Sequence, residues 1–211
     1  MIRVIITDDH PVVLKGLKEI ISEGFSDATI TVSSKGYDLL NMITKNDYDL
    51  VLLDISLPDI NGLDVLKEIK KKKQKLPVLI LSMYPEENYA VRALKAGAWG
   101  YLTKGSAPDE LLQAVRKILS GKKYISPALA EKMMFDFESD TEKPAHERLS
   151  DRELQVLSMI GRGKAVKQIA DELHLSTNTV RTFRSRILEK MGVKGTNELI
   201  HYAIAHNLTA Q

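Results

Sequence analysis

Hydrophobic positions in the first 120 residues alternate between two spacings. Five short apolar runs are rich in residues that favour strands, and those with Val, Ile and Leu on successive positions are typical of strands buried on both faces of a parallel sheet. These runs are Ile2–Ile6, Ala28–Val32, Leu50–Leu53, Val78–Leu81 and Ala98–Leu102. Stretches with helical spacing follow them in turn, at 11–24, 35–46, 62–73, 86–96 and 107–120. Five strand–helix units predict an α/β fold with a doubly wound, five-stranded parallel sheet.

Residues that break secondary structure fall between these elements. Pro58 follows the third predicted strand, Pro77 opens the fourth, and Gly121 ends the last helix of the set. Ser106 is a candidate N-cap for that last helix, because a hydroxyl can accept a hydrogen bond from a free N–H in the first turn. The positions of these breakers agree with the strand–helix alternation.

The pattern weakens from residue 122 to residue 147. A short helix is possible from Pro127 to Phe137, and the polar stretch Glu138–Pro144 that follows is typical of a linker. We therefore expect three parts, which are a first domain at 1–121, a linker at 122–147 and a second domain at 148–211.

The last 64 residues or so show helical spacing alone. Candidate helices lie at 150–162, 165–173, 176–191 and 196–207. The first of them opens with a capping box, in which Ser150 is the N-cap and Glu153 the acidic residue three positions later. This segment predicts a small all-α domain.

Composition limits the classes of protein to which the chain can belong. Hydrophobic residues make up 44% of the 211 residues, which suits packed globular domains. There is no cysteine, so disulfides and thiolate metal sites are excluded. No apolar run is long enough to cross a membrane, and the N-terminus reaches two acidic residues too early for a signal peptide. We expect a cytoplasmic protein with no membrane partner.

The net charge is +2, but the charged residues are distributed unevenly along the chain. Residues 148–211 hold ten Lys and Arg against six Asp and Glu, whereas residues 124–147 hold two against six. The most basic part of the chain is therefore its C-terminal segment, where a nucleic-acid surface would be expected.

Polar residues stand where four of the predicted strands end. Asp8 and Asp9 follow the first strand and Asp54 the third, while Ser82 and Lys104 follow the fourth and fifth. In an open α/β sheet these ends share one edge, which is where ligands bind. Three carboxylates there need a cation, and hard oxygen ligands at this density favour Mg²⁺. A carboxylate can also attack a phosphoryl group, whose charge Mg²⁺ and a lysine would neutralise. Asp54 is the best candidate nucleophile, because an unbroken apolar strand carries it to the centre of the sheet edge.

This set of residues resembles the receiver domain of two-component response regulators, which has a flavodoxin-like fold. The resemblance covers about residues 1–121 and implies that Asp54 is the phosphoacceptor. Mg²⁺ would be held by Asp9, Asp54 and the backbone carbonyl of Ser56, and Asp8 would act mainly through a water. Ser82 and Lys104 would bind the phosphoryl oxygens. Tyr101 would be the rotameric switch that they control, although an aromatic residue at a strand end serves packing about as often.

Three neighbours of this site have weaker assignments. His10, beside Asp9, could suggest a metal ligand, but with Pro11 after it we expect it to start the first helix. Ser56 and Tyr84 are expected to tune hydrolysis of the acyl phosphate, in a direction that the sequence does not give.

Residues 165–191 have the pattern of a helix-turn-helix. A short amphipathic helix is followed by His174-Leu175 and then by a helix that opens with Ser176, and small Ala170 permits a close helix crossing. The second helix carries basic and hydroxyl side chains on its non-core positions, as a recognition helix needs. The candidate DNA-binding residues are Thr179, Arg181, Thr182, Arg184, Ser185, Arg186 and Lys190.

These residues resemble the LuxR-type DNA-binding domain, so the whole chain resembles the NarL/FixJ family. By this resemblance Arg181, Thr182 and Ser185 face bases, while Thr179 and Lys190 contact the DNA backbone. The segment 163–167 departs from the family, since it replaces a common polar pair and could change how a helix is capped. Phe183 also departs, because it stands where the family often has histidine.

The last predicted helix carries four apolar residues at helical spacing. They are Leu199, Ile200, Ala203 and Ile204. In the family this helix makes a two-fold dimer contact. Burial inside the single chain would explain the same pattern equally well.

The resemblance implies a response regulator that a sensor histidine kinase phosphorylates on Asp54. It would bind double-stranded promoter DNA, as a homodimer when phosphorylated or DNA-bound, and would regulate transcription. We expect no enzyme activity beyond Mg²⁺-dependent phosphorylation and dephosphorylation of its own aspartate. One alternative is a hydrolase with an aspartyl-phosphate intermediate, but Ser56 stands where its general acid is expected. Another is an interaction module that works unphosphorylated, which the complete acidic set disfavours.

Overall fold

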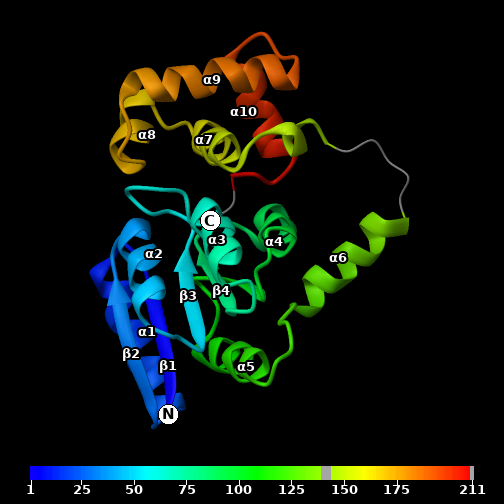
Figure 1. Ribbon diagram of the computed structural model, residues 1–211. Helices are drawn as coiled ribbons and strands as arrows, with labels where there is room; N and C mark the ends of the chain where they lie inside the picture. The colour runs from blue at the N-terminus through cyan, green and yellow to red at the C-terminus, as the bar shows by residue number, and fades with distance from the viewer. Residues whose placement is uncertain (139–143, 210–211) are drawn as a thin grey trace. The chain divides into compact units, whose positions relative to one another are not determined.

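The computed structural model describes residues 1–138 and 144–209, and the linker predicted around Glu138–Pro144 lies mostly outside this range. The chain divides into two compact units, Met1–Phe137 and Glu138–Gln211 (Figure 1). Each unit has its own set of packed elements, so each is described by itself.

The first unit contains the predicted five-stranded parallel sheet, in the order β2-β1-β3-β4-β5. Its strands are β1 (Ile2–Thr7), β2 (Ala28–Ser33), β3 (Leu50–Asp54), β4 (Val78–Ser82) and β5 (Gly100–Thr103). Every residue of β3 and β4 is buried, because helices cover both faces of the sheet centre. The prediction of a doubly wound α/β fold is confirmed.

Five helices connect and flank these strands (Figure 1). They are α1 (Pro11–Gly24), α2 (Gly36–Lys45), α3 (Gly62–Lys72), α4 (Glu86–Lys95) and α5 (Pro108–Leu119). Apolar side chains of α1 and α5, such as Ile21 and Leu111, pack with alternate residues of the central strands in one core. Gly121 has a φ of 84°, a left-handed conformation in which glycine ends a helix without strain.

The expected N-cap of α5 is wrong by one residue. Ala107 is the N-cap and Pro108 is the first helical residue, and Ser106 instead lies with its hydroxyl 3.4 Å from that of Thr103. Proline fits this first position because its N–H would be unpaired there and its φ is already helical. Pro108 therefore determines where α5 starts, and the Ser106 hydroxyl lies near Thr103 at the end of β5.

The register of the sheet brings the predicted site residues to one edge. Thr7 pairs with Leu53, so Asp8 emerges beside Asp54, and Asp54 pairs in turn with Leu81. The backbone N–H of Lys104 donates to the carbonyl of Ser82 over 2.8 Å. Four chain segments that are distant in sequence thus end side by side.

The chain after α5 packs on the first unit before a sixth helix, α6 (Pro127–Glu138), begins. Tyr124 joins the core beneath α5, and its backbone N–H donates to the carbonyl of Trp99 over 2.7 Å. Ser126 opens α6, accepts the N–H of Leu129 and donates its hydroxyl to Glu86 on α4 over 2.7 Å. The start of the expected linker is therefore built into the first unit.

The second unit is helical throughout its described residues. It contains a 3-10 turn, η1 (Ala145–Arg148), which was not predicted, followed by α7 (Asp151–Gly161), α8 (Val166–Glu172), α9 (Thr177–Met191) and α10 (Thr196–Ala205). The predicted capping box is present, since Ser150 accepts the Glu153 N–H and Glu153 accepts the Ser150 N–H. His174, in the short turn between α8 and α9, has a φ of 51°, so the tight connection is made by a residue in left-handed geometry.

The departure at 163–167 leaves α8 with an incomplete cap. Ala165 is the N-cap residue and has no side-chain acceptor, while Gln168 accepts the Ala165 N–H over 2.8 Å. The helix therefore has one half of a capping box and lacks the other.

Replacing Ala165 with serine should raise the free energy of unfolding of the second unit by about 1 kcal/mol, because serine supplies the missing acceptor. Differential scanning calorimetry of the full chain would measure this change. The control Lys167→Ser places the same residue at an exposed position in the first turn of α8, beyond the N-cap, where a change within about 0.5 kcal/mol is expected. Equal stability of A165S and wild type would contradict the capping argument.

Candidate functional site

Two buried carboxylates and one lysine form the centre of the site at the carboxyl edge of the sheet. Asp8 follows β1 and Asp54 ends β3, and their side chains are 1% and 2% exposed. Lys104, just after β5, places its Nζ 2.6 Å from Asp8 Oδ2 and 2.9 Å from Asp54 Oδ2. The predicted convergence of Asp8, Asp54 and Lys104 is thus present in the structure.

Electrostatics at this centre disfavours the charged form of Asp54. Burial raises the pKa of Asp54 to about 6, against the opposing effect of Lys104, and the charge of Asp8 adds to the increase. For Lys104, burial acts to lower the pKa, but Asp54 and Asp8 outweigh it and hold the pKa above its usual value. The lysine is therefore firmly charged, and the site still carries an excess of negative charge.

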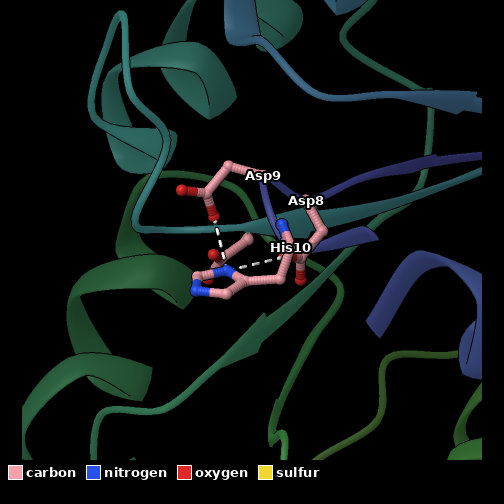
Figure 2. Close-up of side chains that lie close together, drawn as sticks. Asp8, Asp9 and His10 are labelled. Carbon is pink, nitrogen blue, oxygen red and sulfur yellow. Dashed lines mark hydrogen bonds and ion pairs between the residues drawn. The ribbon is translucent and has the colours of Figure 1, made fainter. Parts of the chain in front are cut away.

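The acidic residues can hold a cation. One ligand atom from each of Asp8, Asp9, His10 and Asp54 lies within 4.8 Å of the others, and Figure 2 shows the first three side by side. The buried Asp54 Oδ1 has no hydrogen-bond partner among the described residues, although Oδ2 pairs with Lys104. A buried carboxylate oxygen without a partner is costly, and a divalent ion would satisfy it. The donor set therefore fits Mg²⁺.

The loop after β3 packs closely beneath the Asp54 backbone. The N–H of Gly62 donates to the carbonyl of Ile55 over 2.8 Å, and a Cβ at Gly62 would overlap the carbonyl of Asp54. Asn61 caps α3 by accepting the Leu63 N–H over 2.9 Å. Glycine is required at 62 because the chain folds back directly over the strand end.

Ser82 and Tyr101 lie inside the unit, next to α4. The Ser82 hydroxyl accepts the N–H of Tyr84 over 3.1 Å, and Ser82 is fully buried. The Tyr101 hydroxyl donates to the Tyr84 carbonyl over 2.7 Å, and burial raises the pKa of Tyr101. The ring of Tyr84 stacks on Tyr89 of α4 at 4.6 Å between centroids. Tyr101 is thus in an inward position, connected through Tyr84 to α4.

The contacts around α4 had no signal in the sequence pattern. Tyr84 stood out only as a neighbour of the site, and the sequence pattern gave no sign of a role for Tyr89 or Glu86. The stacking of Tyr84 on Tyr89 joins residues five positions apart across the start of α4, whereas the bond from Ser126 to Glu86 joins residues 40 positions apart. Helical phase alone could indicate that Tyr89 faces inward, but no signal gives its partner.

The raised pKa of Asp54 predicts a pH dependence of stability in the absence of divalent ions. Between about pH 4 and pH 6 the folded protein keeps a proton on Asp54 that the unfolded chain has released. The free energy of unfolding should therefore fall as pH rises through this window, by about 3 kcal/mol. Asp54→Asn cannot titrate, so we expect it to exceed wild type by about 3 kcal/mol above pH 6 and to match it near pH 4.

Urea unfolding in EDTA would measure this difference, with fluorescence of Trp99 as the signal. Trp99 is the sole tryptophan of the sequence and belongs to the first unit, so it reports on that unit alone. A difference between the two proteins that did not change with pH would contradict the assignment of the raised pKa to Asp54.

Helix α9 presents most of the predicted DNA-binding residues at the surface. Its core side is formed by Val180 and Ile187, which are fully buried. Arg181, Thr182, Ser185 and Arg186 are exposed, and Arg184 is half-buried. The helix starts at the N-cap Ser176, whose hydroxyl accepts the Thr179 N–H over 3.0 Å. The exposed residues form a basic and hydroxyl-rich face, as expected.

Four of the predicted DNA-binding residues have partners among the described residues of the unit. Arg181 and Thr182 both bond to Asn178, about one turn earlier in α9. Lys190 places its Nζ 2.6 Å from Oε2 of Glu153, the buried capping residue of α7. The half-buried Thr179 has its hydroxyl 2.8 Å from that of Ser176. Lys190 thus links α9 to α7, which the sequence pattern had not indicated, and Thr179 takes part in the N-cap of α9.

The four apolar residues of α10 divide into two pairs. Leu199 and Ala203 are fully buried within the unit, where Ala203 lies against Gly161 of α7. Ile200 is half-buried, and Ile204 is 55% exposed. Of the two explanations that the sequence left open, burial within the unit accounts for Leu199 and Ala203, and a dimer contact stays a prediction for Ile200 and Ile204.

Both parts of the chain match known protein families. Residues 4–116 match the response regulator receiver domain, and residues 147–203 match the bacterial regulatory proteins of the luxR family. Response regulator UvrY of Escherichia coli K12 is 34% identical over 209 residues, which are 99% of this chain and 96% of that protein. Response regulator GacA of Pseudomonas aeruginosa is 32% identical over 209 residues, or 99% and 98% of the two chains.

Solved structures agree with these matches. RcsB of Salmonella enterica serovar Typhimurium, bound to promoter rprA with the phosphomimetic BeF₃⁻, has a TM-score of 0.65. It is 26% identical, over 97% of this chain and 100% of that one. A second RcsB–DNA complex has a TM-score of 0.59 at 26% identity, over 97% and 98% of the two chains.

Fold, site and comparisons define a receiver domain joined to a LuxR-type helix-turn-helix. The chain belongs to the NarL/FixJ family of two-component response regulators, which confirms the resemblance found in the sequence. It is a transcription regulator that binds DNA, and not an enzyme of the usual kind. Among the described helices, none is both long and apolar enough to span a membrane.

Proposed function

We propose that this response regulator accepts a phosphoryl group on Asp54 from a sensor histidine kinase in the cytoplasm. An Asp54 carboxylate oxygen attacks phosphorus, a P–O bond forms, and the P–N bond to the kinase histidine breaks. The observation that carries this proposal is the buried Asp54 carboxylate, with one oxygen on Lys104 and the other without a partner among the described residues.

The residues around Asp54 would have separate tasks. Mg²⁺ held by Asp9, Asp54 and the Ser56 carbonyl, and by Asp8 through a water, would neutralise charge on the phosphoryl oxygens. Lys104 already lies within 2.9 Å of Asp54 and would pair with a phosphoryl oxygen, while Ser82 would donate its hydroxyl to another. Phosphorylation and hydrolysis of this one aspartate would be the only chemistry of the protein.

The contacts around α4 suggest how the phosphoryl group acts at a distance. If the phosphoryl group drew the Ser82 hydroxyl toward Asp54, the hydrogen bond that this hydroxyl accepts from the Tyr84 N–H would break. Tyr84, whose carbonyl accepts a hydrogen bond from the Tyr101 hydroxyl, would then be displaced. Tyr84 stacks on α4, and α4 holds the start of α6 through Glu86 and Ser126. We propose that this route shifts the population of receiver states and thereby favours a homodimer that binds DNA.

Labelling with radioactive acetyl phosphate tests the first half of this proposal. We expect one acid-stable, base-labile phosphoryl group per chain, formed with Mg²⁺ and not with EDTA. Continuous release of phosphate over many turnovers, as fast as in a phosphatase, would instead favour the hydrolase alternative.

DNA binding by α9 gives a second test, because Arg181 is exposed where a recognition helix contacts bases. Arg181→Ala should weaken binding to duplexes selected by the wild-type protein by about 1–3 kcal/mol and relax their sequence preference. Fluorescence anisotropy at fixed salt would measure the affinity. The control Lys15→Ala changes an exposed lysine of α1, and an equal loss in that variant would count against a role for Arg181 in base recognition.

A further inference from the structure

The proposed function leaves His10 without a task, although its ring lies on the acidic cluster. His10 is the N-cap residue of α1, yet its side chain makes no capping hydrogen bond within the described chain. Its Nδ1 is instead 2.7 Å from Asp9 Oδ1 and 3.3 Å from Asp8 Oδ1, as the dashed lines in Figure 2 show. The backbone N–H of His10 also donates to Asp8 Oδ1 over 2.9 Å. The start of the helix therefore fixes the ring beside two carboxylates.

We propose that His10 is a nitrogen ligand of the cation site and gives it a preference for a divalent transition-metal ion such as Mn²⁺ over Mg²⁺. This inference rests on the proposed cation site at Asp54. Mg²⁺ takes oxygen ligands and keeps its waters, so an imidazole adds little to its binding. Transition-metal ions accept imidazole together with carboxylates, so the same ring would strengthen their binding.

The two oxygens of each buried carboxylate face different neighbours, which supports a place for an ion beside His10. Lys104 pairs with the Oδ2 atoms of Asp8 and Asp54. Asp8 Oδ1 faces His10, and Asp54 Oδ1 has no hydrogen-bond partner among the described residues. The lysine thus occupies one oxygen of each carboxylate. Asp54 Oδ1 is available to an ion beside His10, and Asp8 Oδ1, which accepts the His10 N–H, would meet a water of that ion.

The distances are close to those that one ion needs. Opposite ligands of an octahedral ion lie about 4.3 Å apart, with bonds of about 2.1–2.2 Å. The candidate ligand atoms of Asp9, His10 and Asp54 lie within 4.8 Å of one another, so closing on an ion requires shifts of a few tenths of an ångström. The ligand atom of Asp8 is equally near and would reach the ion through a water. The His10 side chain is 64% exposed and can make such a shift without disturbing the core.

Pulsed EPR of Mn²⁺ bound to the full-length protein tests this proposal. Wild type should show ¹⁴N coupling from a directly bound imidazole, and His10→Asn should lose it, since asparagine keeps a good N-cap for α1 and removes the ring. Competition between the two ions should show the Mn²⁺ to Mg²⁺ affinity ratio falling about tenfold in H10N. His201→Asn, which changes an exposed histidine of α10, should leave both measurements unchanged.

Two results would overturn the inference. One is a spectrum without ¹⁴N coupling in wild type, and the other is an equal change in affinity for both ions in H10N, as expected if the ring only holds the carboxylates. Mn²⁺ binding by the Asp54→Asn variant distinguishes failure of this inference from failure of the proposed function. If D54N binds Mn²⁺ as tightly as wild type, the cation site itself is wrong, whatever His10 does.

Discussion

Replacing Asp54 with asparagine is expected to abolish phosphoryl labelling by acetyl phosphate. The amide has nearly the shape of the carboxylate, but it is a far weaker nucleophile and a weaker ligand for Mg²⁺. Asp54 ends the central strand and is 2% exposed, with Lys104 on one carboxylate oxygen and the cation ligands around the other. Intact-protein mass spectrometry after incubation with Mg²⁺ and acetyl phosphate would show the loss directly.

Asp64→Asn is the matched control for that experiment. Asp64 is a half-exposed residue in the first turn of α3, where it pairs with Lys67. Its variant should be labelled like wild type. Labelling of D54N at the wild-type rate, with the phosphoryl group mapped to another residue, would show that Asp54 is not the acceptor.

Replacing Lys104 with methionine is expected to lower the free energy of unfolding of the receiver domain by about 3–5 kcal/mol in EDTA. Methionine keeps much of the volume of the side chain but leaves the charges of Asp8 and Asp54 buried without their cation. Urea unfolding followed by Trp99 fluorescence reports on this domain alone. Added Mg²⁺ should stabilise K104M more than wild type, because a bound ion restores part of the lost positive charge.

Lys15→Met provides the comparison for that loss. Lys15 lies on α1, where it pairs with Glu19 at 4.0 Å and is 80% exposed. Exposed pairs of this kind contribute little, so the change should be within about 0.5 kcal/mol. A similarly small change in K104M would mean that the lysine does not stabilise the two buried carboxylates.

The acidic site could be predicted from the sequence because a parallel sheet leaves little freedom. Asp8, Asp54 and Lys104 each follow an apolar run, and the carboxyl ends of parallel strands share one edge. The direction of each strand thus placed these residues before any distance was known. The N-caps Ser150 and Ser176 were predictable for a similar reason, since their partners lie three residues away.

Contacts between distant elements could not be predicted in this way. Glu153 could be identified as a capping residue, but its ion pair with Lys190 depends on how α7 and α9 cross. The faces of α10 posed the same problem, since the apolar spacing of Leu199 and Ile204 is consistent with either core or dimer contacts. Burial of Leu199 against the rest of its unit required the packing of the whole domain.

The central claim is that phosphorylation of Asp54 controls DNA binding. Its most direct test is the affinity of the full-length protein for a selected duplex, measured by anisotropy with and without acetyl phosphate and Mg²⁺. Wild type should bind at least about fivefold more tightly when phosphorylated, which is the lower range of coupling between two sites. D54N should bind equally under both conditions. An unchanged wild-type affinity, at full occupancy of the phosphoryl group, would contradict the account.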